Sequence, residues 1–231
     1  MTAADGGARR GERRRAANTA GHGRMRRRSV CGMRYAHLGA EPRIHPTAVI
    51  APTAVISGDV EIGPECRVLH GAVITAEGGP VTFGAHVIVM ENALVRATAV
   101  NPVHIADHVL IGPMASISGA VIEPEVFVAT GARVFNGAHI GTGSEVRINA
   151  VVHLRTTLPA RSVVPIAWVA VGDPAIIVSP DQHERIWERQ QELDFPGYVF
   201  GLDRDTPDLM VQLTERYGRG LARHADDTPL P

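Results

Sequence analysis

Lysine is absent from this chain of 231 residues, and cysteine occurs only at Cys31 and Cys66. Without lysine the protein has neither a Schiff-base amine nor the cationic side chain that a P-loop requires. Cys31 lies in a polar N-terminal segment and Cys66 is predicted to be buried, so a disulfide framework is not expected.

Long apolar runs are also missing, and aromatic residues make up only 4% of the chain. No segment has the apolar stretch of a signal peptide or of a membrane span. We therefore predict a cytoplasmic protein without membrane contact. The shortage of aromatic residues indicates a narrow core filled by Ile, Val and Ala.

Negative charge is scarce in the first 32 residues, which contain nine Arg but only Asp5 and Glu12. This segment has a net charge of +7, so the rest of the chain must carry −8 to give the overall −1. It has too few apolar residues to fold and is predicted to be disordered. Two hypotheses for this segment are an arm that binds nucleic acid and an organellar transit segment. We favour a third, an upstream start chosen in error with Met25 or Met33 as the true beginning, and predict no nucleic-acid partner.

What the chain does have is a repeat of mostly branched apolar side chains with a period of six residues, which we call the beat. Two positions before the first six of them stand Pro42, Ala48, Ala54, Val60, Cys66 and Ala72. The beat is interrupted by two short insertions and one slip of a residue. Its members are Ile44, Ile50, Ile56, Ile62, Val68, Ile74, Phe83, Val89, Val95, Ile105, Ile111, Ile117, Ile122, Val128, Val134, Ile140, Val146, Val152 and Leu158.

This beat predicts a solenoid of short strands. Side chains two positions apart on a strand point to the same face, so each hexad contains one strand and one turn. Stacked coils then satisfy the backbone hydrogen bonds that a single coil leaves open. We expect the solenoid to span residues 33–175 and a separate helical segment to span residues 176–231.

The hexad pattern resembles the hexapeptide-repeat superfamily over roughly residues 44–175. In that superfamily three hexads make one triangular turn of a left-handed parallel β-helix. The resemblance therefore implies an all-β solenoid of left hand, an exception to the usual right-handed crossover, followed by C-terminal α-helices.

Two helices are predicted after the solenoid. Ser179-Pro180-Asp181-Gln182 has the form of an N-cap, a Pro at N1 and a capping-box Gln, followed by a helix to about residue 193. A turn is expected at Pro196-Gly197. A second helix should follow Asp208 with Leu209, Leu213, Tyr217 and Leu221 on one face. The last several residues are expected to fray.

Three segments are most similar to the gamma-class carbonic anhydrases: residues 71–80, residues 105–109 and Gly172-Asp173-Pro174-Ala175. The resemblance implies a homotrimer with a catalytic zinc between subunits, held by two His of one chain and one of its neighbour. The matching positions here are Arg96, Ser118 and Pro113. None is histidine, so we expect no metal cofactor there and no carbonic anhydrase activity.

The surrounding positions also depart from that family. Its Arg-Gly-Asp becomes Thr75-Ala76-Glu77, and its Gln-Asp pair becomes Met90-Glu91, so only acidic character survives. An arginine cannot ligate a cation. The sequence therefore predicts either a cleft that binds a small anion or carboxylate or an ion pair between subunits from Arg96 to Glu77 or Glu91. The candidate site is Arg96, Ser118, Pro113, Thr75, Glu77 and Glu91.

Two further possibilities follow from the histidines. His86 and His108 should stack on adjacent turns between Glu65 and Glu125, an arrangement that could hold a metal but is more often a polar corner. The second enzyme class on this scaffold, the acyltransferases, uses a His base. Ser116 replaces that His in the matching segment, which leaves His153 or His70 as the candidate base.

Overall fold

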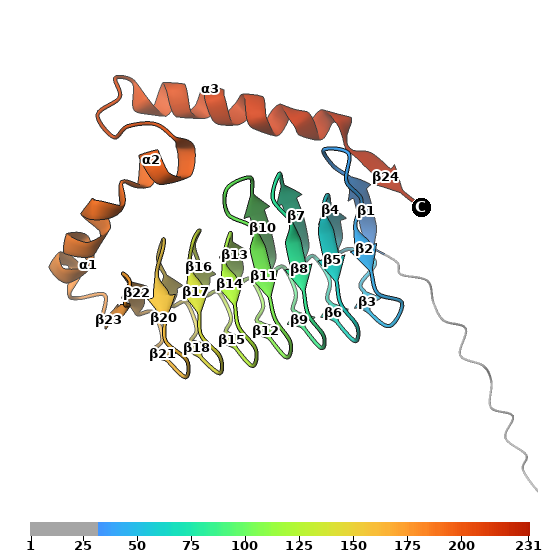
Figure 1. The fold of residues 1–231 in the computed structure, drawn as a ribbon, viewed down its shortest axis with the longest axis horizontal. Helices are drawn as coiled ribbons and strands as arrows, with labels where there is room; N and C mark the ends of the chain where they lie inside the picture. The colour runs from blue at the N-terminus through green and yellow to red at the C-terminus, as the bar shows by residue number, and fades with distance from the viewer. Residues whose placement is uncertain (1–31) are drawn as a thin grey trace, which may run out of the picture.

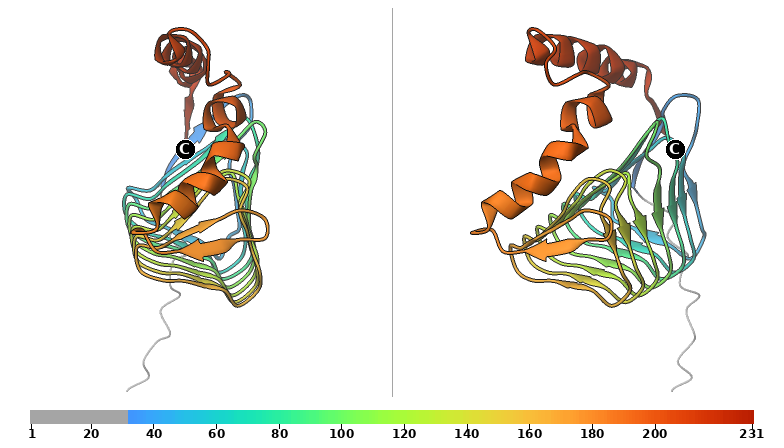
Figure 2. Two further views of the ribbon diagram at one scale, coloured as in Figure 1. Left: turned by 90° about the vertical axis from the view of Figure 1, so that its left-hand side faces the viewer. Right: turned by 60° about the vertical axis from the view of Figure 1, so that its left-hand side comes forward.

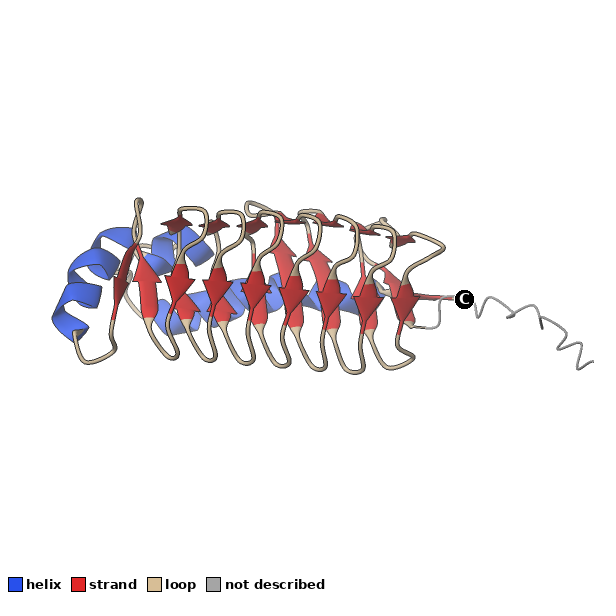
Figure 3. Cartoon of the chain, turned by 90° about the horizontal axis from the view of Figure 1, so that it is seen from below, coloured by secondary structure: helices blue, strands red, loops and turns tan. Residues whose placement is uncertain are grey.

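The computed structural model describes residues 32–231 and shows a solenoid whose three faces are parallel β-sheets (Figure 1). It is a left-handed β-helix, so the predicted fold class is confirmed. The predicted leader lies, except for residue 32, outside the described residues. Figure 3 shows the coils stacked side by side with the helices along one face of the prism.

Each face takes one strand from each turn of the solenoid. The first face contains β2 (Arg43–Ile44), β5 (Val60–Ile62), β8 (Val81–Phe83), β11 (Val103–Ile105), β14 (Val121–Ile122), β17 (His139–Ile140) and β20 (Thr157–Leu158). The second face contains β3 (Val49–Ile50), β6 (Arg67–Val68), β9 (Ile88–Val89), β12 (Leu110–Ile111), β15 (Phe127–Val128), β18 (Glu145–Val146) and β21 (Val163–Val164).

The third face is the longest. Its parallel strands are β1 (Met33–Ala36), β4 (Val55–Ser57), β7 (Val73–Glu77), β10 (Leu94–Thr98), β13 (Ser116–Ser118), β16 (Arg133–Val134), β19 (Val151–Val152) and β22 (Val169–Val171). An antiparallel strand closes each end of this face, β23 (Ile176–Val178) beside β22 and β24 (Thr228–Leu230) beside β1.

The core is the set of hexad residues that the beat predicts. Ile56, Ile74 and Ile117 are fully buried, and strand register places Ile56 opposite Ile74 on neighbouring coils. Cys66 fills a small inward position at 1% exposure, as predicted, and its Sγ contacts the carbonyl oxygen of Gly84 at 3.1 Å. Burial of apolar surface stabilises a fold by about 25 cal/mol per Å². In this protein that stabilisation is therefore spread evenly along the prism.

The two insertions in the beat lengthen two neighbouring strands of the third face. β7 and β10 have five residues each and pair from Val73 and Leu94 to Glu77 and Thr98. The slip of one residue falls at Gly119, whose φ is +50° and whose added Cβ would lie 2.4 Å from Cβ of Asn101. The interruptions therefore form one raised edge beside the third face.

The C-terminal segment contains α1 (His183–Gln190), the 3₁₀ turn η1 (Gln191–Leu193), α2 (Phe195–Phe200), α3 (Leu209–Leu221) and the 3₁₀ turn η2 (Ala222–Asp226). Both predicted helices are present. α1 begins three residues later than expected: its N-cap is Gln182 instead of Ser179, and no side chain forms a capping hydrogen bond. The predicted turn at Pro196-Gly197 is wrong, since Pro lies in the first turn of α2, where a missing N–H costs nothing.

The prediction that the last residues fray is wrong. β24 pairs antiparallel with β1, from Arg34 opposite Leu230 to Ala36 opposite Thr228. The exposed edge of β1 supplies the unpaired backbone groups that this strand uses. The segment from α1 to β24 thus turns back along the solenoid, as both views of Figure 2 show. None of the helices within residues 32–231 is long and apolar enough to cross a bilayer.

Candidate functional site

A cavity of ≈ 400 Å³ lies between the third face and the helices α2 and α3. Its floor is formed by side chains of the solenoid and its roof by side chains of the helices. The lining residues are Glu77, Arg96, Thr98, Ser118, Phe135, Asn136, Leu154, Phe195, Val199, Phe200, Leu213, Arg216, Tyr217, Gly220, Leu221 and Arg223.

The roof is held in place by polar and aromatic contacts. Tyr198 of α2 donates a hydrogen bond to Oδ1 of Asn101 at 2.8 Å, on the loop that follows β10. Phe200 packs edge-to-face against Tyr217 of α3, with 5.7 Å between ring centroids. Arg216 donates to the carbonyl oxygen of Gly201 at 3.0 Å. The raised edge made by the insertions therefore anchors the helices over the cavity.

Arg96 lies on the cavity floor in β10. Its Nη1 donates to the hydroxyl of Tyr217 at 3.2 Å, whereas its Nε is buried without a hydrogen-bond partner. None of the ion pairs formed within residues 32–231 includes Arg96. A guanidinium stays charged at any working pH, so this cation faces the cavity without a carboxylate partner.

The predicted column of the third face is present in the structure. Strand register places Thr75 opposite Arg96 and Arg96 opposite Ser118. Thr75 is buried and donates to Oε1 of Glu77 at 2.8 Å. Arg96, Ser118 and Glu77 line the cavity together, with Thr75 beneath Glu77. The structure thus brings four of the six candidate residues together.

The other two candidates, Pro113 and Glu91, lie elsewhere. Both follow strands of the second face, and the backbone N–H of the exposed Met114 bonds to the carbonyl oxygen of Glu91 at 3.0 Å. Neither lines the cavity. Within the described part of the chain, the structure does not bring these two residues to Arg96.

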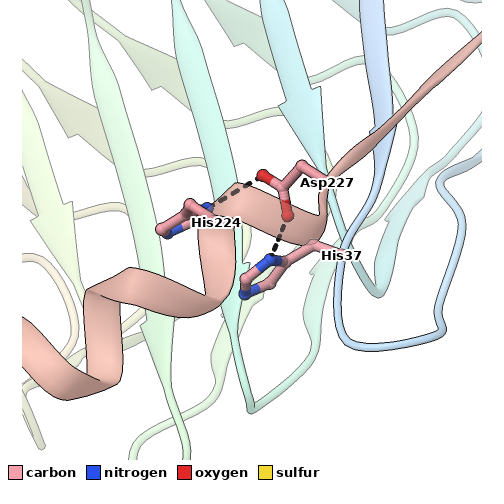
Figure 4. A group of neighbouring side chains, drawn as sticks. All are labelled: His37, His224 and Asp227. Atoms are coloured by element: carbon pink, nitrogen blue, oxygen red, sulfur yellow. Dashed lines mark hydrogen bonds and ion pairs between the residues drawn. The ribbon is translucent and has the colours of Figure 1, made fainter.

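A second cluster, which the sequence analysis did not identify, joins the two ends of the described chain. His37 follows β1, and His224 and Asp227 lie in and after η2 (Figure 4). Asp227 contacts both rings: its Oδ1 lies 2.5 Å from Nδ1 of His37, and its Oδ2 lies 2.9 Å from Nδ1 of His224. The imidazoles stack with centroids 4.3 Å apart.

Glu77 faces the same cluster from the end of β7. Nε2 of His224 lies 3.0 Å from its Oε2, and Nε2 of His37 lies 3.9 Å from that atom. The hydrogen bond to Asp227 raises the pKa of His224, with Glu77 adding to the effect and burial opposing it. Burial alone would raise the pKa of Asp227, but the hydrogen bonds from His224 and His37 outweigh burial and lower that pKa. No short motif signals this cluster, because 190 positions separate His37 from Asp227.

The remaining histidine predictions have different outcomes. His86 and His108 stack as predicted, with centroids 4.9 Å apart and an interplanar angle of 6°. Glu65 pairs with Arg67 at 2.9 Å instead of turning to the rings. His153 lies beside Phe135 on the third face, and burial lowers its pKa. Glu65 thus takes part in an ion pair on its own coil, and the neutral form of His153 is favoured.

The sequence of the solenoid is similar to those of several known proteins. Gamma carbonic anhydrase 1, mitochondrial, of Arabidopsis thaliana is 30% identical over 128 residues, which are 53% of this chain and 46% of that protein. Gamma carbonic anhydrases and hexapeptide transferases are both among the homologues of this chain. The carboxysome assembly protein CcmM of Synechococcus elongatus is 31% identical over 205 residues, 83% of this chain and 35% of that protein.

The chain matches less than half of the length of each of those two relatives. No family model matches the chain. Among solved structures, a putative acetyltransferase of Bacillus cereus is 20% identical, with a TM-score of 0.49 over 83% of this chain and 96% of that chain.

Proposed function

We propose that this homologue of the gamma carbonic anhydrases is a cytoplasmic homotrimer that binds a small organic carboxylate and carries out no carbonic anhydrase reaction. The observation that supports this most strongly is Arg96, a permanent cation on the floor of a cavity with a buried, unpartnered Nε. A carboxylate would supply the missing acceptor in a charge-assisted bond. Ser118 lies beside it as a hydroxyl donor.

The charge of the cavity wall favours an anion. Arg96, Arg216 and Arg223 line it against a single carboxylate, Glu77. That carboxylate is already occupied by Thr75 and by a histidine. A ligand carboxylate entering this space therefore meets an excess of positive charge.

The remaining wall favours an apolar tail. Phe135 and Leu154 come from the solenoid, and Phe195 and Leu213 come from the helices. A pocket lined mostly by apolar side chains with a few polar groups at one end orients an amphipathic ligand. We infer that hexanoate should bind better than acetate, because each buried methylene contributes about 0.8 kcal/mol.

Residues at the family's zinc positions do not fit a metal. Zinc requires nitrogen, sulfur or oxygen ligands at about 2 Å, and in catalytic sites three protein ligands plus a water. A guanidinium offers no lone pair, and the proline ring nitrogen that follows Gly112 is an amide without ligand capacity. The proposal therefore includes no reaction step through zinc at these positions.

Thermal denaturation with sodium hexanoate tests the proposal. At about ten times the dissociation constant, binding should raise Tm by about 3 °C, and acetate should have a smaller effect at the same concentration. Arg96→Ala should abolish the shift, because the ligand loses its charged partner.

Arg43→Ala is the matched control, since Arg43 lies on the first face and pairs with Asp59 and Glu61. It should retain the full shift. A shift that survives Arg96→Ala, or measurable acceleration of carbon dioxide hydration by the purified chain, would contradict the proposal. No shift with any small carboxylate would leave a structural role as the better account.

A mostly apolar row on the second face supports the homotrimer. Five of the seven strands begin with an apolar residue, and the row runs Val49, Arg67, Ile88, Leu110, Phe127, Glu145 and Val163. Val49, Ile88, Phe127 and Val163 are 56%, 36%, 38% and 45% exposed. The corresponding column of the first face is mostly polar. A concentration of exposed apolar side chains on one face is typical of a subunit contact, and Ile88, Leu110 and Phe127 follow one another without a charged residue between them.

Light scattering tests this part of the proposal, with a trimeric mass as the expected result. Phe127→Glu should shift the protein toward monomer, because it places a carboxylate in the contact. A monomer for the unchanged chain would contradict the trimer.

Acyl transfer from an acyl-CoA is the second candidate, and His153 is the observation that favours it. Burial lowers the pKa of this imidazole, and its Nδ1 is buried without a partner. A neutral imidazole can act as a general base. His70, the other candidate, is hydrogen-bonded to Thr53 at 2.8 Å. Release of CoA from acetyl-CoA that His153→Ala abolishes would favour this candidate over carboxylate binding.

A further inference from the structure

The C-terminal strand β24 has little apolar packing to hold it on the solenoid. All three of its residues are exposed or half-buried, and its backbone pairing with β1 covers three positions. A strand this short has little stability of its own. The polar cluster of His37, Glu77, His224 and Asp227 lies next to β24, so the attachment of the strand depends on the contacts within this cluster.

One half of the cluster belongs to the solenoid and is fixed there. His37 is 2% exposed, and its backbone N–H and C=O both bond to Ala40 across a tight loop. Glu77 is the last residue of β7 and accepts a hydrogen bond from Thr75 on the same strand. The other half is His224 in η2 together with the aspartate that directly precedes β24 (Figure 4). Contacts between the halves therefore join the C-terminal segment to β1 and β7.

Hydrogen-bond geometry assigns two protons to the ring of His224. Its Nδ1 lies 2.9 Å from Oδ2 of Asp227, and its Nε2 lies 3.2 and 3.0 Å from the two carboxylate oxygens of Glu77. An ionised carboxylate only accepts hydrogen bonds, so a lone pair on either ring nitrogen would face a carboxylate oxygen. Only the imidazolium form satisfies both contacts.

His37 requires only one proton. Its Nδ1 lies 2.5 Å from Oδ1 of Asp227, whereas its Nε2 lies 3.9 Å from Glu77 and has no hydrogen-bond partner. The ring stacks on that of His224 with 4.3 Å between centroids, and two positive charges at that separation would repel. With His37 neutral, the cluster holds one positive charge between two carboxylates.

Loss of the second proton from His224 would leave these carboxylates without a cation. The side chains of Glu77 and Asp227 are each only 17% exposed, so water screens their charges poorly. A lone pair on His224 would then face one of them at about 3 Å. Deprotonation therefore turns the attraction between the two halves of the cluster into repulsion.

Neighbouring charges do not take over the part of the imidazolium. The other charged or titratable side chains of β1, β7, β10 and η2, and those of α3 that line the cavity beside Glu77, are Arg34, Tyr35, Arg96, Arg216, Tyr217, Arg223 and Asp226. In the part of the chain that the structure describes, none of them forms an ion pair or a side-chain hydrogen bond with the cluster. The charge state of His224 thus controls the contact.

We propose that the cluster is a proton-dependent latch, which holds η2 and β24 on the solenoid while His224 is protonated and releases them when that ring loses its proton. Release uncovers the edge of β1 and frees the end of the cavity roof that Leu221 and Arg223 form. Access to the cavity from this end is then controlled by pH. The latch requires no ligand, so it is independent of the carboxylate proposal.

Two shifted groups set the direction of the pH dependence. The hydrogen bond to Asp227, with the charge of Glu77, raises the pKa of His224 above its ordinary 6.5, so this contribution is complete below pH 6.5 and is lost as the pH rises through the raised pKa. Although burial opposes them, hydrogen bonds lower the pKa of Asp227 below 3.8, so its contribution is lost only in stronger acid. The latch is therefore fully closed between pH 3.8 and 6.5 and opens on the alkaline side.

Hydrogen exchange of the whole chain, followed by mass spectrometry of the peptide of residues 224–231, tests the latch. Protection is expressed relative to the same peptide free in solution at each pH, which removes the base catalysis of exchange. It should fall at least about fivefold between about pH 6 and pH 9. His224→Gln should show the low value at both, because a neutral amide replaces the cation. His224→Arg should keep the high value in alkali, because a guanidinium stays charged.

His139→Gln is the matched control, since His139 pairs with Glu123 at 2.9 Å on the first face, away from the C-terminal segment. This variant should behave as the unchanged chain does, and circular dichroism shows whether each variant is folded. Three results would each overturn the latch: equal protection of the unchanged chain in acid and alkali, a His224→Arg protein that loses protection in alkali as the unchanged chain does, or equal effects of His139→Gln and His224→Gln.

Discussion

Replacing Ile117 by alanine should lower the free energy of unfolding by about 3 kcal/mol. Ile117 is the inward residue of β13, near the middle of the prism, and is fully buried. Its neighbours in the stack, Val95 below and Val134 above, belong to coils that are hydrogen-bonded to its own. The coils cannot collapse into the space left by the lost carbons without breaking those bonds, so a cavity remains.

Ile148→Ala provides the comparison, because it is the same chemical change at a residue that is 45% exposed. It should cost less than about 1 kcal/mol. Unfolding in urea, followed by circular dichroism, measures both values. A similar loss for the two variants would contradict the assignment of the hexad residues as the core.

Gly63→Ala should destabilise the protein by about 3 kcal/mol. A Cβ at this position would lie 2.2 Å from the carbonyl oxygen and 2.7 Å from the carbonyl carbon of Gly84, on the next coil. Both atoms are backbone, so no side chain can rotate away. The coil spacing of about 4.8 Å must increase locally, and the hydrogen bond from Gly63 N to Phe83 O, 3.1 Å long, would be strained.

The same substitution at Gly218 should have the opposite sign. Gly218 lies inside α3, and nothing stands within 4 Å of an added Cβ. Alanine there should raise stability by about 0.5–1 kcal/mol, because glycine loses more backbone entropy in a helix. Thermal and urea denaturation of both variants check the pair. A Gly63→Ala protein as stable as the unchanged chain would mean that the coils stack less closely than described.

The fold could be predicted from the sequence because each hexad encodes its own coil. Ile56, Ile74 and Val95 occupy equivalent inward places for a local reason, a period of six in a strand and turn. The insertions in the beat appear as the longer strands β7 and β10. The same period placed Arg96 next to Ser118, which strand register confirms.

The predictions that were wrong concern the C-terminal segment. Pro196 opens α2, and the final residues pair with β1. Neither outcome follows from local propensity. A three-residue strand such as β24 has little intrinsic stability and forms because the edge of β1 is unpaired. The sequence around residue 228 carries no sign of that edge, which is almost two hundred positions away.

The amino-acid sequence by itself determined the solenoid, the inward residues, the column with Arg96 and Ser118, and the two main helices, since each depends on spacing within a few residues. Only the tertiary structure decided that α2 and α3 roof a cavity over Arg96 and that His37, His224, Asp227 and Glu77 meet. Those contacts join coils and helices far apart in the chain, and their formation depends on how the packed segments stand in space.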